Sequence, residues 1–355
     1  MLDRVLGRGA THQLKGDHDR AVADYSVVIQ LSPGGVLAYT CRGESYYKKG
    51  DYERAIADFS EAIQLNPGDV ALYSNRGTCY HYKGNYDHAI ADYGKAIQLR
   101  PDSVDLYINR GNSYKGKMDY DHAIADYNKA IDLRPNSAHG YFNRGSCYAR
   151  RSGWDRPVSE YAEIISPESG GVELFFGVTY RYSPDLDRAI SDFDRAIQIK
   201  PDFAAAYDSR AVAFGIKKDY DKCIADDDKA IEIDPNFAEA YFNPGNAYGR
   251  IGDYSRAISD YSKAIELKPH FPEAYLFRGS AYAYKLDYRS AIVEFSKAIQ
   301  LQPDFVFAYY NRGVAYMYKG EKDKAIADLK TAAKLRDDPM LRNNVKGLLT
   351  KPGAS

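Results

Sequence analysis

The stretch from Ala38 to Pro67, AYTCRGESYYKKGDYERAIADFSEAIQLNP, decides the fold of this chain. Its first half spaces large and small residues three and four positions apart, which places them on one face of a helix. The segment KKGDY then interrupts this spacing. Gly50 can adopt the left-handed conformation that ends a helix, and Asp51 can cap the next one. The second half is again helical in its spacing until the proline, so the stretch predicts two short helices joined by a tight turn.

Copies of this stretch recur along the chain, and a proline closes each copy. The prolines are Pro33, Pro67, Pro101, Pro135, Pro167, Pro201, Pro235, Pro269 and Pro303. All are 34 residues apart except Pro135 and Pro167, which are separated by 32. A fixed period of this length is typical of stacked arrays, in which each helix pair packs only against its neighbours. The small residues let the two helices of a copy approach closely, and the aromatic residues fill the remaining space.

This repeat resembles that of the tetratricopeptide repeat family. In one copy the matching residues are Tyr73, Gly77, Tyr80, Ala89, Tyr93, Ala96 and Pro101. The resemblance extends from Leu2 to Pro339, and it implies a superhelix of antiparallel helix pairs whose first helices line the concave face. We therefore expect an all-α fold, an α-α superhelix (solenoid) of about ten 34-residue helix-turn-helix repeats. The expected units are 2–35, 36–69, 70–103, 104–137, 138–169, 170–203, 204–237, 238–271, 272–305 and 306–339, with a C-terminal capping helix and tail at 340–355.

Two of these units, 138–169 and 170–203, depart from the pattern. The first has Pro157 where its siblings have alanine, so we expect a degenerate unit with a shortened second helix. Trp154, the only tryptophan, is expected in the core. The second unit keeps the glycine of its first helix but places Pro184 in the turn between its helices. Altered stacking is the expected result.

An arginine at one repeat position is followed sixteen residues later by an acid. The pairs are Arg42 and Asp58, Arg76 and Asp92, Arg110 and Asp126, Arg144 and Glu160, Arg210 and Asp226, Arg278 and Glu294, and Arg312 and Asp328. We expect an ion-pair ladder between the two helices of each repeat; a solvated charged face is the alternative. Phe176 and Pro244 replace the arginine in two units, which removes the usual partner of Asp192 and Asp260. A proline inside a helix also costs about 3 kcal/mol, so 204–250 is expected to be soft.

Asparagine recurs at one position of the first helices, two residues after a large tyrosine. The five residues are Asn75, Asn109, Asn143, Asn243 and Asn311. Two residues turn a helix by about 200°, so these side chains should point away from the core. An amide both donates and accepts hydrogen bonds. The series resembles the asparagine ladder of O-GlcNAc transferases, which implies that it holds the backbone of an extended peptide; a merely polar surface is the alternative.

Aromatic residues share the expected concave face with these asparagines. The tyrosines expected to contact a partner are Tyr47, Tyr82, Tyr284, Tyr310 and Tyr318. Tyrosine gives a large amphipathic contact at low entropic cost. Toward the C-terminus this face becomes more apolar, with Leu276, Phe307, Tyr310, Val314 and Met317. That end is expected to be either a second peptide pocket or a self-association surface.

Charge and composition exclude several classes of function. The chain has 355 residues and a net charge of −1, which argues against a protein that binds nucleic acid through a basic surface. It has no apolar run long enough for membrane insertion and no signal-peptide core, so we expect a cytoplasmic protein. No cysteine or histidine cluster predicts a metal or other cofactor, and no catalytic constellation predicts an enzyme.

Two functions remain open from the sequence. The first is a scaffold or adaptor that binds an extended peptide or a partner protein in the concave groove. The second is a structural assembly unit that associates with itself as a homo-oligomer. A further alternative is that the chain is the repeat portion of a longer multidomain protein.

Overall fold

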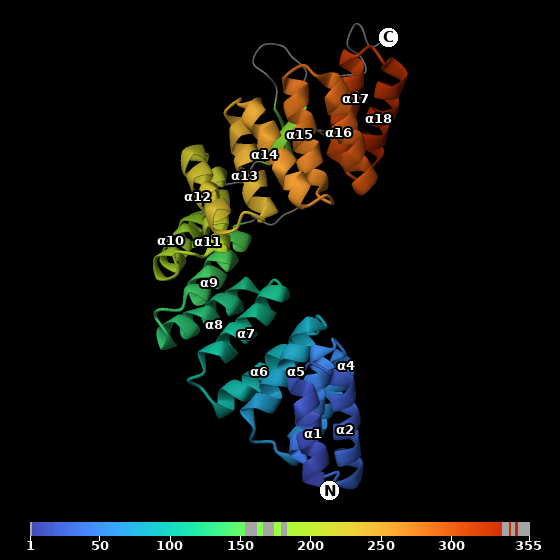
Figure 1. Ribbon diagram of the computed structural model, residues 1–355. Helices are drawn as coiled ribbons and strands as arrows, with labels where there is room; N and C mark the ends of the chain where they lie inside the picture. The colour runs from blue at the N-terminus through green and yellow to red at the C-terminus, as the bar shows by residue number, and fades with distance from the viewer. Residues whose placement is uncertain are drawn as a thin grey trace. The chain divides into compact units, whose positions relative to one another are not determined.

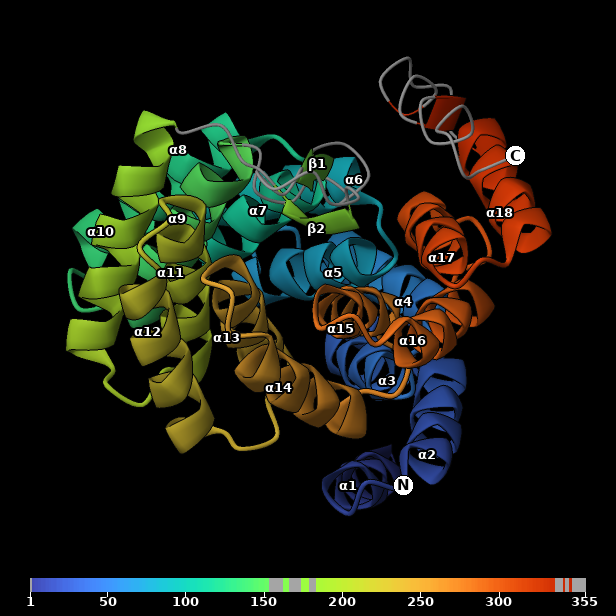
Figure 2. The same cartoon turned by 90° about the horizontal axis from the view of Figure 1, so that it is seen from above.

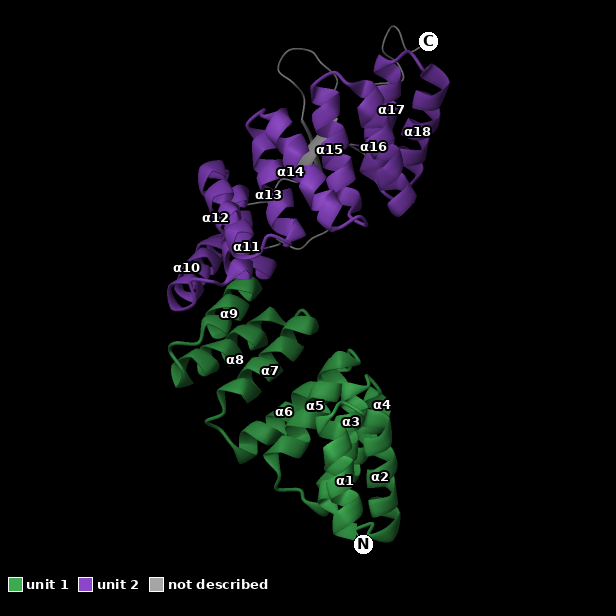
Figure 3. Ribbon diagram, in the orientation of Figure 1, with its two compact units in different colours: residues 1–148 green, residues 149–355 purple. Residues whose placement is uncertain are grey.

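The structure is a computed structural model that describes residues 2–152, 162–165, 174–178, 183–335, 341 and 345–346. Figure 3 shows the two compact units into which the chain divides, Met1–Tyr148 and Ala149–Ser355. We call them unit 1 and unit 2 and describe each by itself.

Unit 1 is a series of antiparallel helix pairs (Figure 1). Its helices are α1 (Leu2–Leu14), α2 (His18–Leu31), α3 (Val36–Lys48), α4 (Tyr52–Leu65), α5 (Val70–Tyr82), α6 (Tyr86–Leu99), α7 (Val104–Gly116), α8 (Tyr120–Leu133) and most of α9 (Ala138–Arg151). Each of α2, α4, α6 and α8 packs against the first helix of its own pair, and α2, α4 and α6 also pack against the first helix of the next pair. The first helices α1, α3, α5 and α7 also contact one another in turn, so they form an inner row.

Unit 2 repeats this arrangement and adds a small sheet. Its helices are α10 (Pro184–Ile199), α11 (Ala204–Ile216), α12 (Tyr220–Ile233), α13 (Ala238–Arg250), α14 (Tyr254–Leu267), α15 (Pro272–Tyr284), α16 (Tyr288–Leu301), α17 (Val306–Tyr318) and α18 (Lys322–Leu335). Here α11, α13, α15 and α17 form the inner row. Strands β1 (Ala162–Ile165) and β2 (Leu174–Val178) pair in antiparallel fashion, as labelled in Figure 2.

The turn chemistry expected from the sequence is present in the helix pairs. Gly50 adopts a φ of +76°, and the carboxylate of Asp51 accepts a hydrogen bond from the backbone N–H of Arg54 at 3.2 Å. The close approach of the two helices depends on a glycine at the contact. At Gly77 an added Cβ would lie 3.2 Å from the ring of Tyr93, which is tighter than an ordinary contact. The small residue and the buried ring therefore fix the distance between the helices of a pair.

The structure differs from the expected units 138–169 and 170–203. Strands β1 and β2 occupy positions where helices were expected, so the prediction of two helix pairs here is wrong. Ile, Phe and Val make up five of the nine strand residues, and these residue types favour strands over helices. The glycines at 170 and 171, in the sequence between the two strands, disfavour a helix there. Trp154 and Pro157 lie outside the described residues.

The contacts at the ends of α9 and α10 show how the chain accommodates these strands. Arg151 donates hydrogen bonds to both carboxylate oxygens of Asp185, at 2.7 and 2.9 Å. The corresponding positions in a regular repeat, Lys49 and Asp51, are two residues apart, whereas Arg151 and Asp185 are 34 apart. We conclude that 32 residues are inserted in the turn of a single repeat. The described part of the chain therefore holds nine helix pairs rather than ten, and Pro184 is the first residue of α10.

The expected C-terminal capping helix at 340–355 lies mostly outside the described residues. Of its described members, Leu341 and Val345 are buried in the core of unit 2 together with residues of α17 and α18.

The ion-pair ladder is confirmed in six of the seven expected pairs, and Glu160 of the seventh lies outside the described residues. In one of them Arg76 donates from Nε and Nη2 to the two oxygens of Asp92, at 2.8 and 2.7 Å. This hydrogen bonding raises the pKa of Arg76 above its usual value. Asp92 is only 6% exposed, so removal of its arginine would leave a buried charge, at a cost of about 3–5 kcal/mol.

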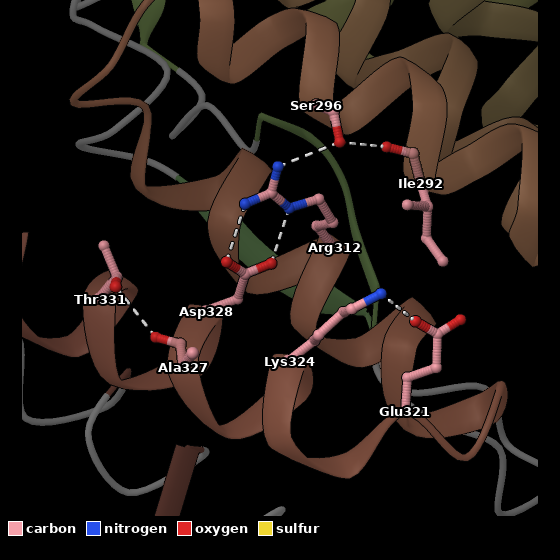
Figure 4. Close-up of polar contacts among 8 residues, drawn as sticks. All are labelled: Ile292, Ser296, Arg312, Glu321, Lys324, Ala327, Asp328 and Thr331. Carbon is pink, nitrogen blue, oxygen red and sulfur yellow. Dashed lines mark hydrogen bonds and ion pairs between the residues drawn. The ribbon is translucent and has the colours of Figure 1, made fainter.

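The third nitrogen of the guanidinium reaches the preceding repeat. Figure 4 shows Arg312 bound to Asp328 in its own pair while Nη1 donates to the hydroxyl of Ser296 at 3.0 Å. The same bridge recurs as Arg42 to Ser26, Arg76 to Ser60 and Arg278 to Ser262. The ladder therefore joins successive repeats as well as the two helices of each repeat.

Candidate peptide-binding face

Three of the expected asparagines occupy the same repeat position in the first helices of unit 1. Asn75, Asn109 and Asn143 stand on α5, α7 and α9, and each is half-buried. Tyr73 and Tyr107, two residues earlier, are 9% and 8% exposed, and their burial turns the asparagines away from the core. Among the described residues, the side-chain amides of Asn75 and Asn109 have no hydrogen-bond partner. Asn143 accepts a hydrogen bond from Nζ of Lys115 at 3.1 Å.

An aromatic cluster lies beside this series. Tyr82 is 59% exposed, and its ring stacks on Tyr52 with centroids 5.6 Å apart and planes at 12°. The ring of Tyr47 lies 6.0 Å from that of Tyr82. Burial raises the pKa of Tyr47 to about 12, so its hydroxyl remains a donor at neutral pH. Tyr47 and Tyr82 thus offer an apolar ring surface with polar edges.

His81 supplies a neutral polar group on the same helix as Tyr82. Its Nδ1 lies 3.0 Å from the hydroxyl of Ser113 on α7. Burial, with the positive charge of Lys115 nearby, lowers the pKa of His81, so the ring stays uncharged at pH 7. The resulting inner face of unit 1 is polar, mostly uncharged and rich in groups that both donate and accept.

The two asparagines of unit 2 have different surroundings. Asn243 donates from Nδ2 to a carboxylate oxygen of Asp208 at 2.9 Å. Asn311 is fully buried and donates to the hydroxyl of Ser280 at 3.1 Å. The expectation that Asn311 points away from the core is wrong. Asn243 uses its amide within the protein, so the five residues do not form one continuous open ladder.

The remaining expected tyrosines also have internal contacts. Tyr310 is fully buried, which contradicts its expected place on an open face. Tyr284 stacks on Tyr254 with centroids 5.0 Å apart, and Tyr318 stacks on Tyr288 at 4.6 Å. Each partner is the first tyrosine of a second helix, 30 residues earlier in the chain. The sequence analysis missed this partner, although the constant separation in the sequence could have indicated it.

A group of carboxylates replaces the usual packing around α11 and α12. Asp227 occupies the position of the buried aromatic ring found in other second helices and is fully buried. Burial raises its pKa well above the ordinary value. Burial and the charge of Glu239 raise the pKa of Asp208 to about 7. These acids are poor candidates for ligand binding, because Asp227 is fully buried and Asp208 already accepts a hydrogen bond from Asn243 of the next repeat.

The described residues contain no group of three or more His, Cys, Asp or Glu side chains arranged to hold a metal ion. None of the described helices combines the length and apolar character needed to cross a bilayer.

Comparison with known sequences supports the repeat assignment. A profile described as TPR repeat matches residues 78–117, 245–287 and 279–320. A profile described as tetratricopeptide repeat matches 36–69, 104–137 and 306–339, and another with the same description matches 228–259. Together these segments cover more than half of the chain. No curated protein matches the chain in a sequence search.

One solved structure of a tetratricopeptide repeat protein shares the fold, and two others align over shorter parts of the chain. A tetratricopeptide repeat protein from Parabacteroides merdae aligns with 79% of this chain and 98% of its own, at a TM-score of 0.57 and 18% identity. YrrB, described as a TPR protein with an unusual peptide-binding site, aligns with 62% of this chain and 97% of its own, at 0.44 and 22%. MamA aligns with 57% of this chain and 92% of its own, at 0.43 and 23%.

Proposed function

The chain belongs to the tetratricopeptide repeat family, whose arrays serve as protein-interaction scaffolds, and we propose that the inner row of unit 1 binds an extended peptide. The observation that carries this proposal is the register of Asn75, Asn109 and Asn143. One half-buried amide per repeat faces the same side, and two of the three have no hydrogen-bond partner among the described residues.

The chemistry of an extended peptide suits this series. Such a peptide presents backbone N–H and C=O groups along its length, and a carboxamide can donate to one and accept from the other. Amides placed once per repeat therefore hold the backbone without selecting particular side chains. The rings of Tyr47 and Tyr82 add apolar contact beside the amides, where a partner's side chain can lie.

No specific observation favours self-association. The apolar residues of α15 and α17 that raised this alternative, including Leu276 and Val314, are buried within unit 2. The partner we propose is therefore a peptide or a protein segment rather than a second copy of the chain.

The experiment uses peptides selected from a random phage-displayed library on the wild-type chain. We expect the variant Asn75→Ala/Asn109→Ala/Asn143→Ala to bind them on the order of a hundredfold more weakly, at about 1 kcal/mol for each lost amide. Asn66, Asn136 and Asn236 are exposed asparagines in turns, and their triple alanine variant is the matched control. Methylation of the peptide's backbone nitrogens should weaken binding to the wild type. Equal affinity of both variants, with native circular dichroism, would overturn the proposal.

A further inference from the structure

The inner row of unit 2 is apolar where that of unit 1 is polar. At the position of Ser74 on α5, α15 carries Leu276 and α17 carries Tyr310. At the position of Asn75, α15 carries Phe277, and at the position of Thr78, α17 carries Val314. Left uncovered, these side chains would form a contiguous apolar patch, and exposed patches of that kind mark interaction sites. We call the face formed by α13, α15 and α17 the C-terminal groove.

The residues of the C-terminal groove are removed from solvent. Leu276, Tyr310 and Val314 are fully buried, and Phe277 is 2% exposed. The equivalent residues of α5 and α7 in unit 1 are only half-buried. The helix pairs are built alike in both units, so the difference points to an additional element on this face.

That element is strand β2. It lies against α13, α15 and α17, the three helices of the C-terminal groove, and Figure 1 shows its green segment beside α15. Its sequence, Leu-Phe-Phe-Gly-Val, is apolar throughout. The strand is extended and contacts three successive first helices, as an extended peptide would on such a face.

The strand reaches the groove because it belongs to the 32-residue insertion between α9 and α10. The ends of this insertion are joined by the ion pair of Arg151 and Asp185, so it leaves the repeat and returns to it at one point. The helix pair therefore does not need the inserted residues to close its turn. The insertion is thus dispensable for its own repeat, and its apolar strand β2 contacts the C-terminal groove. These are the properties of a tethered ligand.

We propose that the C-terminal groove is a binding site for an extended apolar peptide and that β2 is its built-in occupant. A partner's apolar segment then binds only by displacing β2. The inference concerns unit 2 alone and does not depend on the function proposed for unit 1. A tethered segment acts at an effective concentration of about 1 mM, so a β2 segment with an intrinsic Kd of about 10 µM would weaken the binding of a competing peptide about a hundredfold.

The first test measures binding of a fluorescein-labelled peptide with the sequence Val-Glu-Leu-Phe-Phe-Gly-Val-Thr-Tyr, residues 172–180, by fluorescence anisotropy. Two variants empty the groove: Leu174→Ser/Phe175→Ser/Phe176→Ser, and a deletion of 153–184 that restores a regular 34-residue repeat. We expect both to bind about a hundredfold more tightly than the wild type. The control peptide carries serine in place of Leu-Phe-Phe and should not bind. Equal binding to all three proteins, or no binding to variants with native circular dichroism, would overturn the proposal.

The second test keeps the full chain and does not depend on how the variants fold. Phe175 is replaced by the photoreactive analogue p-benzoylphenylalanine, and the protein is irradiated and digested. We expect cross-links to peptides from α13, α15 or α17. Cross-links confined to other elements would show that β2 does not occupy the groove, and would overturn the proposal.

Discussion

Pro244 stands at the repeat position where most first helices carry the arginine of the ladder. Two carboxylates near it therefore lack the hydrogen bonds that this arginine would donate. Asp260, sixteen residues later, is the acid that the missing arginine would bind. Asp228 lies sixteen residues before Pro244. In other repeats a serine at this position accepts the hydrogen bond from Nη1 of the ladder arginine, as Ser262 does from Arg278. Burial and the charge of Asp228 raise the pKa of Asp260 to about 6. Burial also raises the pKa of Asp228.

We predict that Pro244→Arg stabilises the chain. It removes the penalty of a proline inside a helix, about 3 kcal/mol, and supplies a cation to both carboxylates. Folding raises the pKa of Asp260 from 3.8 to about 6, so the folded state favours the protonated carboxyl. The stability that this carboxyl contributes is fully present below pH 4 and is lost as the pH rises through 6. The gain from the arginine should therefore be larger at pH 7 than at pH 4.

Thermal unfolding followed by circular dichroism checks this prediction. Pro244→Ala is the matched control, since it restores the hydrogen bond but not the cation, and it should give a smaller gain with little dependence on pH. A neutral or destabilising effect of Pro244→Arg would mean that α13 has adapted to the proline.

Residue roles were predictable from the sequence where they repeat at a fixed spacing. The separation of sixteen residues predicted the pairing of Arg76 with Asp92, because both helices of a repeat lie within it. The spacing did not predict that Asn311 would be buried, since the same repeat position is only half-buried at Asn75 and Asn109. The spacing did predict the position of Asn75, which is half-buried two residues after the buried Tyr73.

At the scale of the element, the turns between paired helices differ in the residue at their left-handed position. Gly50 and Gly84 adopt a φ of +76° there, whereas Met118, Lys218 and Leu286 adopt φ values of 61°, 63° and 64°. A side chain in this conformation costs about 1–2 kcal/mol. Glycine loses more entropy on folding, about 0.5–1 kcal/mol, which offsets part of that strain.

We predict that Leu286→Gly stabilises the chain by about 0.5–1 kcal/mol, the difference between these two effects. Leu286 is 72% exposed, so little buried surface is lost with its side chain. Urea denaturation measures the change, and Gly84→Leu at the equivalent turn should destabilise by a similar amount. A loss of stability in Leu286→Gly would show that its side chain contributes a contact that outweighs the strain.

The 34-residue period predicted the helix pairs, but it did not predict the strands between α9 and α10. Pro167 lies almost at the expected position of a repeat proline, and Gly177 matches the glycine of a first helix. These coincidences favoured one further helix pair, so that two pairs were expected where α9 and α10 form one. The strand propensity of the segment around Phe175 was visible in the sequence, but the surface that β2 contacts lies about a hundred residues later. A local period carries no information about such a contact.

At the scale of the whole molecule, the two units present inner rows with opposite character. The row of unit 1 is polar and open, with asparagines directed away from the core. The row of unit 2 is apolar, and β2 lies against three of its helices. The same repeat therefore supplies two kinds of face: a polar one, on which we propose that a peptide binds, and an apolar one that strand β2 contacts.

Hydroxyl-radical footprinting of the intact chain tests this contrast most directly, because it needs no partner. Tyr82 is 59% exposed, whereas Tyr310 is fully buried and Phe277 is 2% exposed. The account predicts rapid oxidation of Tyr82 and slow oxidation of Tyr310 and Phe277, with the latter two becoming reactive when 153–184 is deleted. Oxidation of Tyr310 and Phe277 as fast as that of Tyr82 in the intact chain would contradict it.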